Sequence, residues 1–141
     1  MKLTLFADGG SRGNPGPAAG GAVLLDAGGA VVGEAGEFLG RATNNVAEWH
    51  GLLAGLAAAL ELGADELAVR MDSELVVRQL TGVYRVKHPD LKPLFARATS
   101  LLRRFRTVEI KHVPRKENAA ADAVVNRILD EHAREGDPTA R

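Results

Sequence analysis

The sequence of 141 residues contains no cysteine, which excludes disulfide bonds and thiolate metal sites and fits a reducing compartment. It also has no long apolar run, because the alanine- and leucine-rich stretch 52–62 is interrupted by Gly55 and Glu61 and is too short to span a bilayer. The N-terminus leads directly into a strand pattern, without a basic region followed by an apolar segment. We therefore expect a soluble, cytoplasmic protein with no membrane partner.

Several common catalytic and binding motifs are missing as well. The glycine-rich segment 8–17 lacks the lysine and hydroxyl ending of a P-loop and the spacing of a dinucleotide fingerprint. The histidines have no metal-ligand spacing, and no serine–histidine or glycosidase pairing is evident. These absences set aside nucleotide binding of those two kinds, histidine-based metal centres and the common hydrolase sites.

The net charge of zero conceals an uneven distribution. Residues 85–116 carry ten basic and two acidic side chains, so this stretch has a charge of +8 and the remainder −8. A basic block beside acidic clusters suits a polyanionic ligand whose reacting bond must approach cations. The alternative is a solvated helix face with no ligand.

Periodicity predicts one α/β domain over residues 1–135 and a disordered tail over 136–141. Short connections favour antiparallel pairing of the first three strands, with a hairpin turn at 26–29. A helical stripe containing Trp49 follows, and we expect that side chain in the core. The order βββαβααβα gives a mixed five-stranded sheet, three antiparallel strands and then parallel additions, flanked by helices. The expected strands are 2–8, 19–26, 30–39, 66–72 and 107–113, and the expected helices are 45–63, 73–81, 90–105 and 118–135.

Four acidic residues stand where strands end or helices begin. Asp8 and Asp72 each close an apolar run, Glu48 is expected in the first turn of the first helix, and Asp122 lies near the start of the last helix. Such positions meet at one edge of an α/β sheet, where ligands usually bind. Gathered carboxylates repel one another unless cations neutralise them, and their hard oxygen atoms suit Mg²⁺ or Mn²⁺. Each acid taken alone is equally compatible with a helix cap or a solvated surface position.

Two further segments accompany the acids. The glycine-rich segment after Asp8 is either a tight surface loop or a rim that a nucleic acid backbone can approach. Thr43, Asn44 and Asn45 are good helix caps, but two adjacent asparagines exceed what one cap needs. Asparagine offers both a donor and an acceptor to sugars, bases or phosphates.

Together these segments resemble type 1 ribonuclease H. The matching stretches are FADGGSRGNPGP at 6–17, TNNVAE at 43–48, DSELVV at 72–77, and Pro114-Arg115 with Asn118 and Asp122. They occur in the family's order, and the resemblance runs from about residue 2 to 135.

The resemblance implies hydrolysis of the RNA strand of RNA–DNA hybrids with two Mg²⁺ ions, or Mn²⁺, leaving 5′-phosphate and 3′-hydroxyl ends. It assigns Asp8 to both ions, Glu48 and Asp72 to one and Asp122 to the other. It places Asn14, Asn44 and Asn45 in the hybrid's minor groove, where the 2′-hydroxyl distinguishes RNA from DNA, and Thr43 at a DNA-strand phosphate. The full set of expected substrate contacts comprises Gly9, Gly10, Ser11, Asn14, Thr43, Asn44, Asn45 and Asn118. We expect a monomer.

Two departures from the family pattern stand out. The long basic protrusion of some members is reduced to residues 82–88, unless the arginines of 97–106 replace it. A loop histidine often precedes the final aspartate, whereas here Arg115 or Lys116 aligns with it and His112 falls on the strand.

Two alternatives belong to other classes: a non-catalytic hybrid-binding domain of the same fold, and another nuclease of the wider superfamily. The first has no need of four acids. The second is disfavoured by the asparagine pair and the glycine-rich segment.

Overall fold

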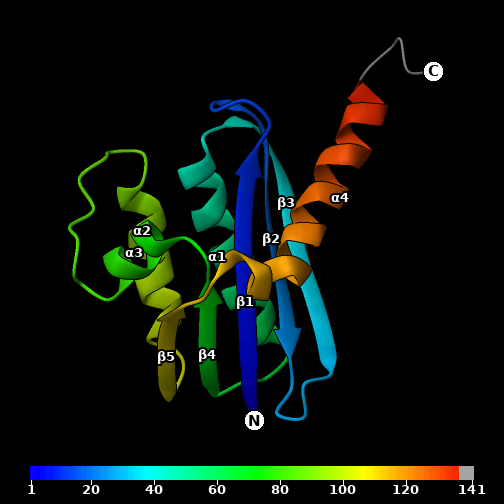
Figure 1. Ribbon diagram of the computed structural model, residues 1–141. Coiled ribbons are helices and arrows are strands. Elements are labelled where there is room, and N and C mark those ends of the chain that lie inside the picture. Colours follow the sequence, from blue (N-terminus) through cyan, green and yellow to red (C-terminus); the bar gives the residue numbers. More distant parts are fainter. Residues whose placement is uncertain (137–141) are drawn as a thin grey trace.

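The computed structural model describes residues 1–136 and forms a single sheet with helices on both faces (Figure 1). The elements are β1 (Lys2–Ser11), β2 (Gly16–Leu25), β3 (Val31–Ala42), α1 (Asn44–Glu61), β4 (Glu66–Met71), α2 (Glu74–Leu80), α3 (Lys92–Leu102), β5 (Thr107–His112), the 3₁₀ turn η1 (Arg115–Asn118) and α4 (Ala119–Gly136). This order confirms the predicted βββαβααβα arrangement.

The sheet has the strand order β3-β2-β1-β4-β5. Strand β1 pairs antiparallel with β2 and parallel with β4, and β5 adds parallel to β4. The predicted mixed sheet is therefore confirmed. The carboxyl ends of β1 and β4 point to the same edge, which brings the segments after Ala7 and Met71 together.

The predicted end of the first strand was wrong. β1 does not stop at Asp8 but continues to Ser11, with Asp8 opposite Gly21 and Gly9 opposite Gly20 on β2. Gly9 and Gly10, which were predicted to lie outside the strand, therefore pair with residues of β2. The connection to β2 is shorter than expected, over residues 12–15.

The glycines of β1 and β2 allow helix α1 to pack with its backbone against the strand backbones. A Cβ on Gly9 would lie 2.1 Å from the carbonyl carbon of Ala47, and one on Gly20 would lie 2.4 Å from the amide nitrogen of Gly51. A Cβ on Gly51 would lie 2.0 Å from the carbonyl oxygen of Asp8. Side chains on these residues would therefore push α1 away from the sheet.

Helix α1 begins and ends where the sequence indicated. Thr43 caps it, since the Val46 N–H donates to Thr43 Oγ1 over 3.2 Å, and Gly63 follows its end with a positive φ of 90°. Trp49 is fully buried in the core, as predicted.

Helix α4 covers the opposite face of the sheet and extends beyond it (Figure 1). Val124 and Val125 pack over Gly21, while Ala19, Val125 and Leu129 form a second small core. The two faces alternate along β2, so Gly20 faces α1 and Gly21 faces α4.

Other boundaries shift by a few residues. The helix expected over 90–105 spans only Lys92–Leu102, and the last helix begins at Ala119, after the 3₁₀ turn η1. Gly136, assigned to the tail, is the last residue of α4, and the rest of the predicted tail, 137–141, lies outside the described residues. None of the helices within residues 1–136 is both long and apolar enough to cross a membrane.

The packing of α1 generates a stability prediction. Helix propensity alone favours alanine over glycine by about 1 kcal/mol, yet Gly51→Ala would place Cβ against the Asp8 carbonyl oxygen. We expect Gly51→Ala to lower the free energy of unfolding by about 2 kcal/mol or more, measured by urea denaturation. Gly28→Ala is the matched control, because its Cβ would meet only Asp26 Oδ1 at 3.4 Å. A Gly51→Ala protein as stable as that control would contradict the packing described.

Candidate active site

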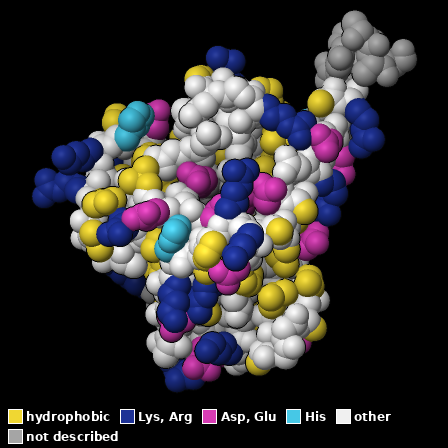
Figure 2. Space-filling model, viewed as in Figure 1, with side chains coloured by type: hydrophobic (Ala, Val, Ile, Leu, Met, Phe, Trp, Pro, Cys, Tyr) yellow, Lys and Arg dark blue, Asp and Glu magenta, His cyan; other side chains and the backbone are white. Residues whose placement is uncertain are grey.

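The four predicted carboxylates line one cavity of about 400 Å³. Asp8 comes from β1, Asp72 from the residue after β4, and Asp122 from the first turn of α4. Glu48 lies in the second turn of α1, one turn later than its sequence context suggested, on the same side of the helix as Gly51. Figure 2 shows acidic side chains near the middle of this face of the molecule, with Lys and Arg side chains beside them.

Asp8 is the most enclosed of the four acids, with 9% of its surface exposed. Burial raises its pKa from 3.8 to about 7, and the charge of Asp72 adds to this effect. The backbone N–H of Gly9 opposes it, while the nearby Asp122 carboxyl raises the pKa further. Asp8 is thus close enough to both neighbouring aspartates to be strongly affected by them.

Glu48 shows the same behaviour on the other side of the cavity. Burial raises its pKa from 4.5 to about 7; a hydrogen bond from Ser73 lowers the pKa, and the charge of Asp72 raises it. Ser73 also caps α2, because the Val76 N–H donates to its Oγ over 3.3 Å. Ser73 therefore links the start of α2 to Glu48, a role that its position directly after Asp72 did not reveal.

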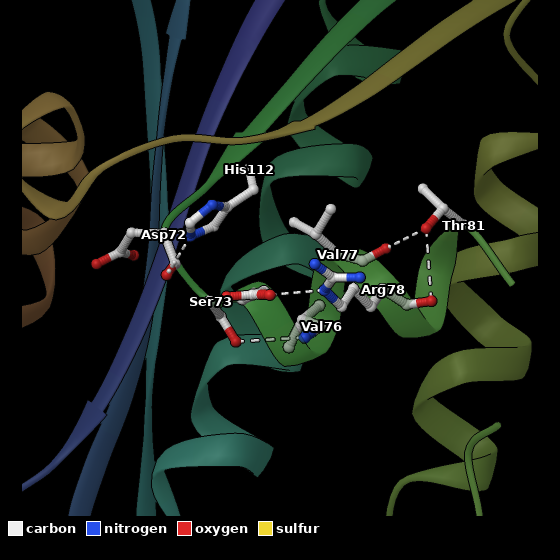
Figure 3. Close-up of polar contacts among 8 residues, drawn as sticks. Asp72, Ser73, Val76, Val77, Arg78, Thr81 and His112 are labelled. Carbon is white, nitrogen blue, oxygen red and sulfur yellow. Dashed lines mark hydrogen bonds and ion pairs between the residues drawn. The ribbon is translucent and has the colours of Figure 1, made fainter. Parts of the chain in front are cut away.

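Asp72 is held from two sides. Asn118 Nδ2 donates to Asp72 Oδ1 over 2.9 Å, and His112 Nε2 lies 3.2 Å from the Asp72 carbonyl oxygen. Figure 3 shows the imidazole facing this backbone carbonyl while the Asp72 carboxylate points away from helix α2. His112 lies on β5, as predicted, but the strand ends at His112, one residue earlier than expected.

Asp122 is connected to residues that sequence analysis missed. Asn126 Nδ2 donates to Asp122 Oδ2 over 3.2 Å, and Arg12 forms an ion pair of 2.7 Å with Asp130 on the same helix. Arg12 and Asn126 also line the cavity. The i, i+4 spacing of Asp122, Asn126 and Asp130 was the only sequence signal for this cluster.

The donor set fits a divalent cation. Four carboxylates provide hard oxygen ligands, and the raised pKa values of Asp8 and Glu48 show a site in which negative charge is poorly compensated by the protein itself. Within residues 1–136, no three histidine, aspartate or glutamate side chains already stand close enough to enclose one ion.

Apart from Asn118, the expected substrate residues fall into two groups. Gly9, Gly10, Ser11 and Asn44 line the cavity, and Asn14, Thr43 and Asn45 line an adjoining groove that shares Asn44 and Glu48 with it. Within the groove wall the Ser11 N–H donates to Asn44 Oδ1, and the Asn44 N–H donates to Asn14 Oδ1.

The prediction that Asn118 contacts the substrate is corrected by its burial. Asn118 is 1% exposed, and its amide donates to Ala7 and Asp72 inside the protein. Its predicted place at a loop end, shortly before Asp122 in the sequence, gave no sign of which way the side chain turns.

The candidate basic residues lie in different places relative to the carboxylate cavity. Arg115 lines the carboxylate cavity, whereas Lys116 does not. Arg106 pairs with Asp65 and Glu66 at the opposite end of β4, so it cannot replace a protrusion at the site. Instead the short segment before α3 supplies the groove wall through His88, Asp90 and Leu91.

Comparison with known proteins agrees with this fold. A family model described as reverse transcriptase-like matches residues 6–128. The N-terminal RNase H domain of Rv2228c from Mycobacterium tuberculosis is 49% identical with a TM-score of 0.93, covering 97% of this chain and 99% of that one. RNase H1 from Halobacterium salinarum is 47% identical with a TM-score of 0.90, covering 93% and 99%. LC11-RNase H1, solved in complex with an RNA/DNA hybrid, is 41% identical with a TM-score of 0.88, covering 93% and 99%.

The fold is that of a ribonuclease H-like protein. More specifically, the chain belongs to the type 1 ribonuclease H family, whose members depend on divalent metal ions. It spans 36% of the length of the curated bifunctional protein Rv2228c, over which it is 52% identical.

The pKa values generate a prediction about stability and pH. A carboxyl whose pKa is raised on folding binds its proton more tightly in the folded state, so stability is lost as the pH rises through the folded pKa. For Asp8 and Glu48 this loss runs from about pH 4 to about pH 7. With a chelator present, thermal unfolding should therefore occur at lower temperature at pH 8 than at pH 5. Saturating Mg²⁺ should recover stability at pH 8.

Asp8→Asn should reduce this pH-dependent loss, and Glu131→Gln, on the exposed side of α4, should leave it intact. The pKa of Asp65 is lowered by its hydrogen bond from the N-terminal amine, and that of Glu109 by its hydrogen bond from Arg70. Those contributions are already complete above pH 5, so they cannot produce the effect. Stability that stays constant or rises from pH 5 to pH 8 in chelator would contradict the raised pKa values of Asp8 and Glu48.

Proposed function

We propose that this protein is an endoribonuclease that hydrolyses the RNA strand of RNA–DNA hybrids. The observation that carries the proposal is the single cavity lined by Asp8, Glu48, Asp72 and Asp122 in a member of the type 1 ribonuclease H family. The hybrid bound to the similar LC11-RNase H1 supports the choice of substrate.

In this proposal the four carboxylates would hold two Mg²⁺ ions, or Mn²⁺ in their place. Asp8 would contribute to both ions, Glu48 and Asp72 to one, and Asp122 to the other. When bound, the ions supply activation of the attacking water and charge neutralisation at the leaving 3′ oxygen. The cleaved strand then carries a 5′-phosphate and a 3′-hydroxyl end.

The protein's own residues orient the reaction. Ser73 and Asn118 hold Glu48 and Asp72, and the buried position of Asp8 limits access of bulk water. Arg115, a permanent cation at working pH, lines the cavity and is available to a substrate phosphate. The acids thus carry the negative charge of the site, and Arg115 provides a positive charge where the substrate phosphate would bind.

Substrate selection rests on the groove beside the cavity. Asn14, Asn44 and Asn45 provide donors and acceptors for the minor groove, where 2′-hydroxyls identify the RNA strand, and Thr43 lies beside them for a DNA-strand phosphate. Gly9, Gly10 and Ser11 form the part of the rim that joins the cavity. We further propose that the protein acts as a monomer. We also propose that it acts in the cytoplasm, a reducing compartment that suits its lack of cysteine.

Parallel digestions test the proposed substrate. Labelled RNA–DNA hybrid, double-stranded RNA and double-stranded DNA of one sequence should be incubated with the protein and Mg²⁺. We expect internal cuts in the RNA strand of the hybrid alone, since only that duplex presents 2′-hydroxyls opposite a DNA strand. Binding of hybrid without any cleavage would favour a non-catalytic binding domain, and digestion from the ends of DNA would favour another nuclease of the superfamily.

The loop residues offer a second test. Arg115→Ala should lower kcat on the hybrid about tenfold or more, because a cation in the cavity is lost, while Lys116→Ala should have a smaller effect. His112→Ala should act mainly through folding stability, since its imidazole faces the Asp72 backbone. If only His112→Ala abolishes turnover in a folded protein, then His112, and not Arg115, takes the place of the family's loop histidine.

A further inference from the structure

Asn118 joins the elements that carry three of the four acids. It is the last residue of η1, directly before α4, whose first turn contains Asp122. Its side-chain nitrogen donates over 2.9 Å to the carbonyl oxygen of Ala7, the residue before Asp8, and over 2.9 Å to Asp72 Oδ1. One buried amide therefore ties β1, the end of β4 and the start of α4 together.

The amide group is well matched to these two acceptors. A carboxamide nitrogen carries two N–H groups, and here one meets a backbone carbonyl and the other a carboxylate. The side-chain oxygen of Asn118 is buried without a hydrogen-bond partner among the described residues. The reversed amide would direct an oxygen at two acceptors, so the observed orientation is the one that these acceptors require.

The bond to Asp72 also divides the roles of its two carboxylate oxygens. Oδ1 accepts from Asn118, while Oδ2 has no hydrogen-bond donor within residues 1–136. This charge-assisted hydrogen bond restricts the carboxylate to one orientation. Asp72 is thereby held ready to bind a cation through its second oxygen.

We propose that Asn118 is a positioning residue that orients Asp72 toward a divalent ion. This inference rests on the proposed function in that it takes Asp72 as a metal ligand. With 1% exposure, Asn118 cannot reach a hybrid, so any effect of Asn118 on cleavage must pass through Asp72 or the backbone of β1.

The test measures metal binding without substrate. Mn²⁺ affinity of the purified protein should be determined by calorimetry for the native sequence, Asn118→Ala and Asn118→Asp. Asn118→Asp keeps the shape of the side chain but cannot donate two hydrogen bonds. Both variants should bind Mn²⁺ about tenfold to a hundredfold more weakly. On the hybrid, kcat should fall while KM stays close to the native value.

Leu67→Ala is the matched control for lost stability. Leu67 is 2% exposed on β4, at the end of the strand away from Asp72, so its truncation weakens the core without touching the acids. The proposal is overturned if folded Asn118→Ala or Asn118→Asp binds Mn²⁺ as tightly as Leu67→Ala. It is also overturned if neither Asn118 variant folds under conditions in which Leu67→Ala does, because the residue is then only structural.

The two proposals fail separately. If the native protein leaves hybrids intact but Mn²⁺ affinity still depends on Asn118, the positioning role stands and the proposed function falls. If the native protein cuts hybrids and the Asn118 variants bind Mn²⁺ normally, only the positioning role falls.

Discussion

The contact between the backbone of helix α1 and the backbones of β1 and β2 is the constraint on which the site depends. It requires the absence of side chains at Gly9, Gly20 and Gly51, where a Cβ would lie within 2.4 Å of a backbone atom. Because Gly51 meets the Asp8 carbonyl directly, Glu48, one helical turn earlier, is brought to the cavity that Asp8 lines. On the other face, Gly21 and Gly10 let Val124 and Val125 approach, which sets α4 and Asp122 at the same edge.

This close packing has an electrostatic cost. It encloses Asp8 and Glu48 so far that burial raises both pKa values to about 7. The protein compensates only in part, through the N–H of Gly9 at Asp8 and the hydroxyl of Ser73 at Glu48. A divalent cation bound among these acids would offset the remaining cost of burial and repulsion, so the packing that destabilises the metal-free site would favour metal binding.

Much of this arrangement could be predicted from local sequence. Element order, the capping role of Thr43, the burial of Trp49 and the convergence of Asp8, Glu48, Asp72 and Asp122 all follow from periodicity and from strand and helix ends. The assignment of these acids as metal ligands remains a prediction.

What sequence analysis missed depends on tertiary contacts. Gly9 and Gly10 were taken for a turn, because nothing local shows that a helix will press on them and keep them in the strand. Asn118 was placed on the substrate, because the direction of a side chain after a loop is decided by acceptors more than forty residues away in sequence. Arg106 was considered for the hybrid, but its partners Asp65 and Glu66 lie at the far end of the sheet.

The most direct test of the account compares hybrid cleavage and hybrid binding in Asp8→Asn. The substitution keeps the shape of the side chain and removes the one carboxylate that both ions share in the proposed site. The account predicts a folded protein that binds hybrid yet cleaves it at least about a thousandfold more slowly, a loss of several kcal/mol of transition-state stabilisation. A folded Asp8→Asn protein that cleaves hybrid at the native rate would contradict it.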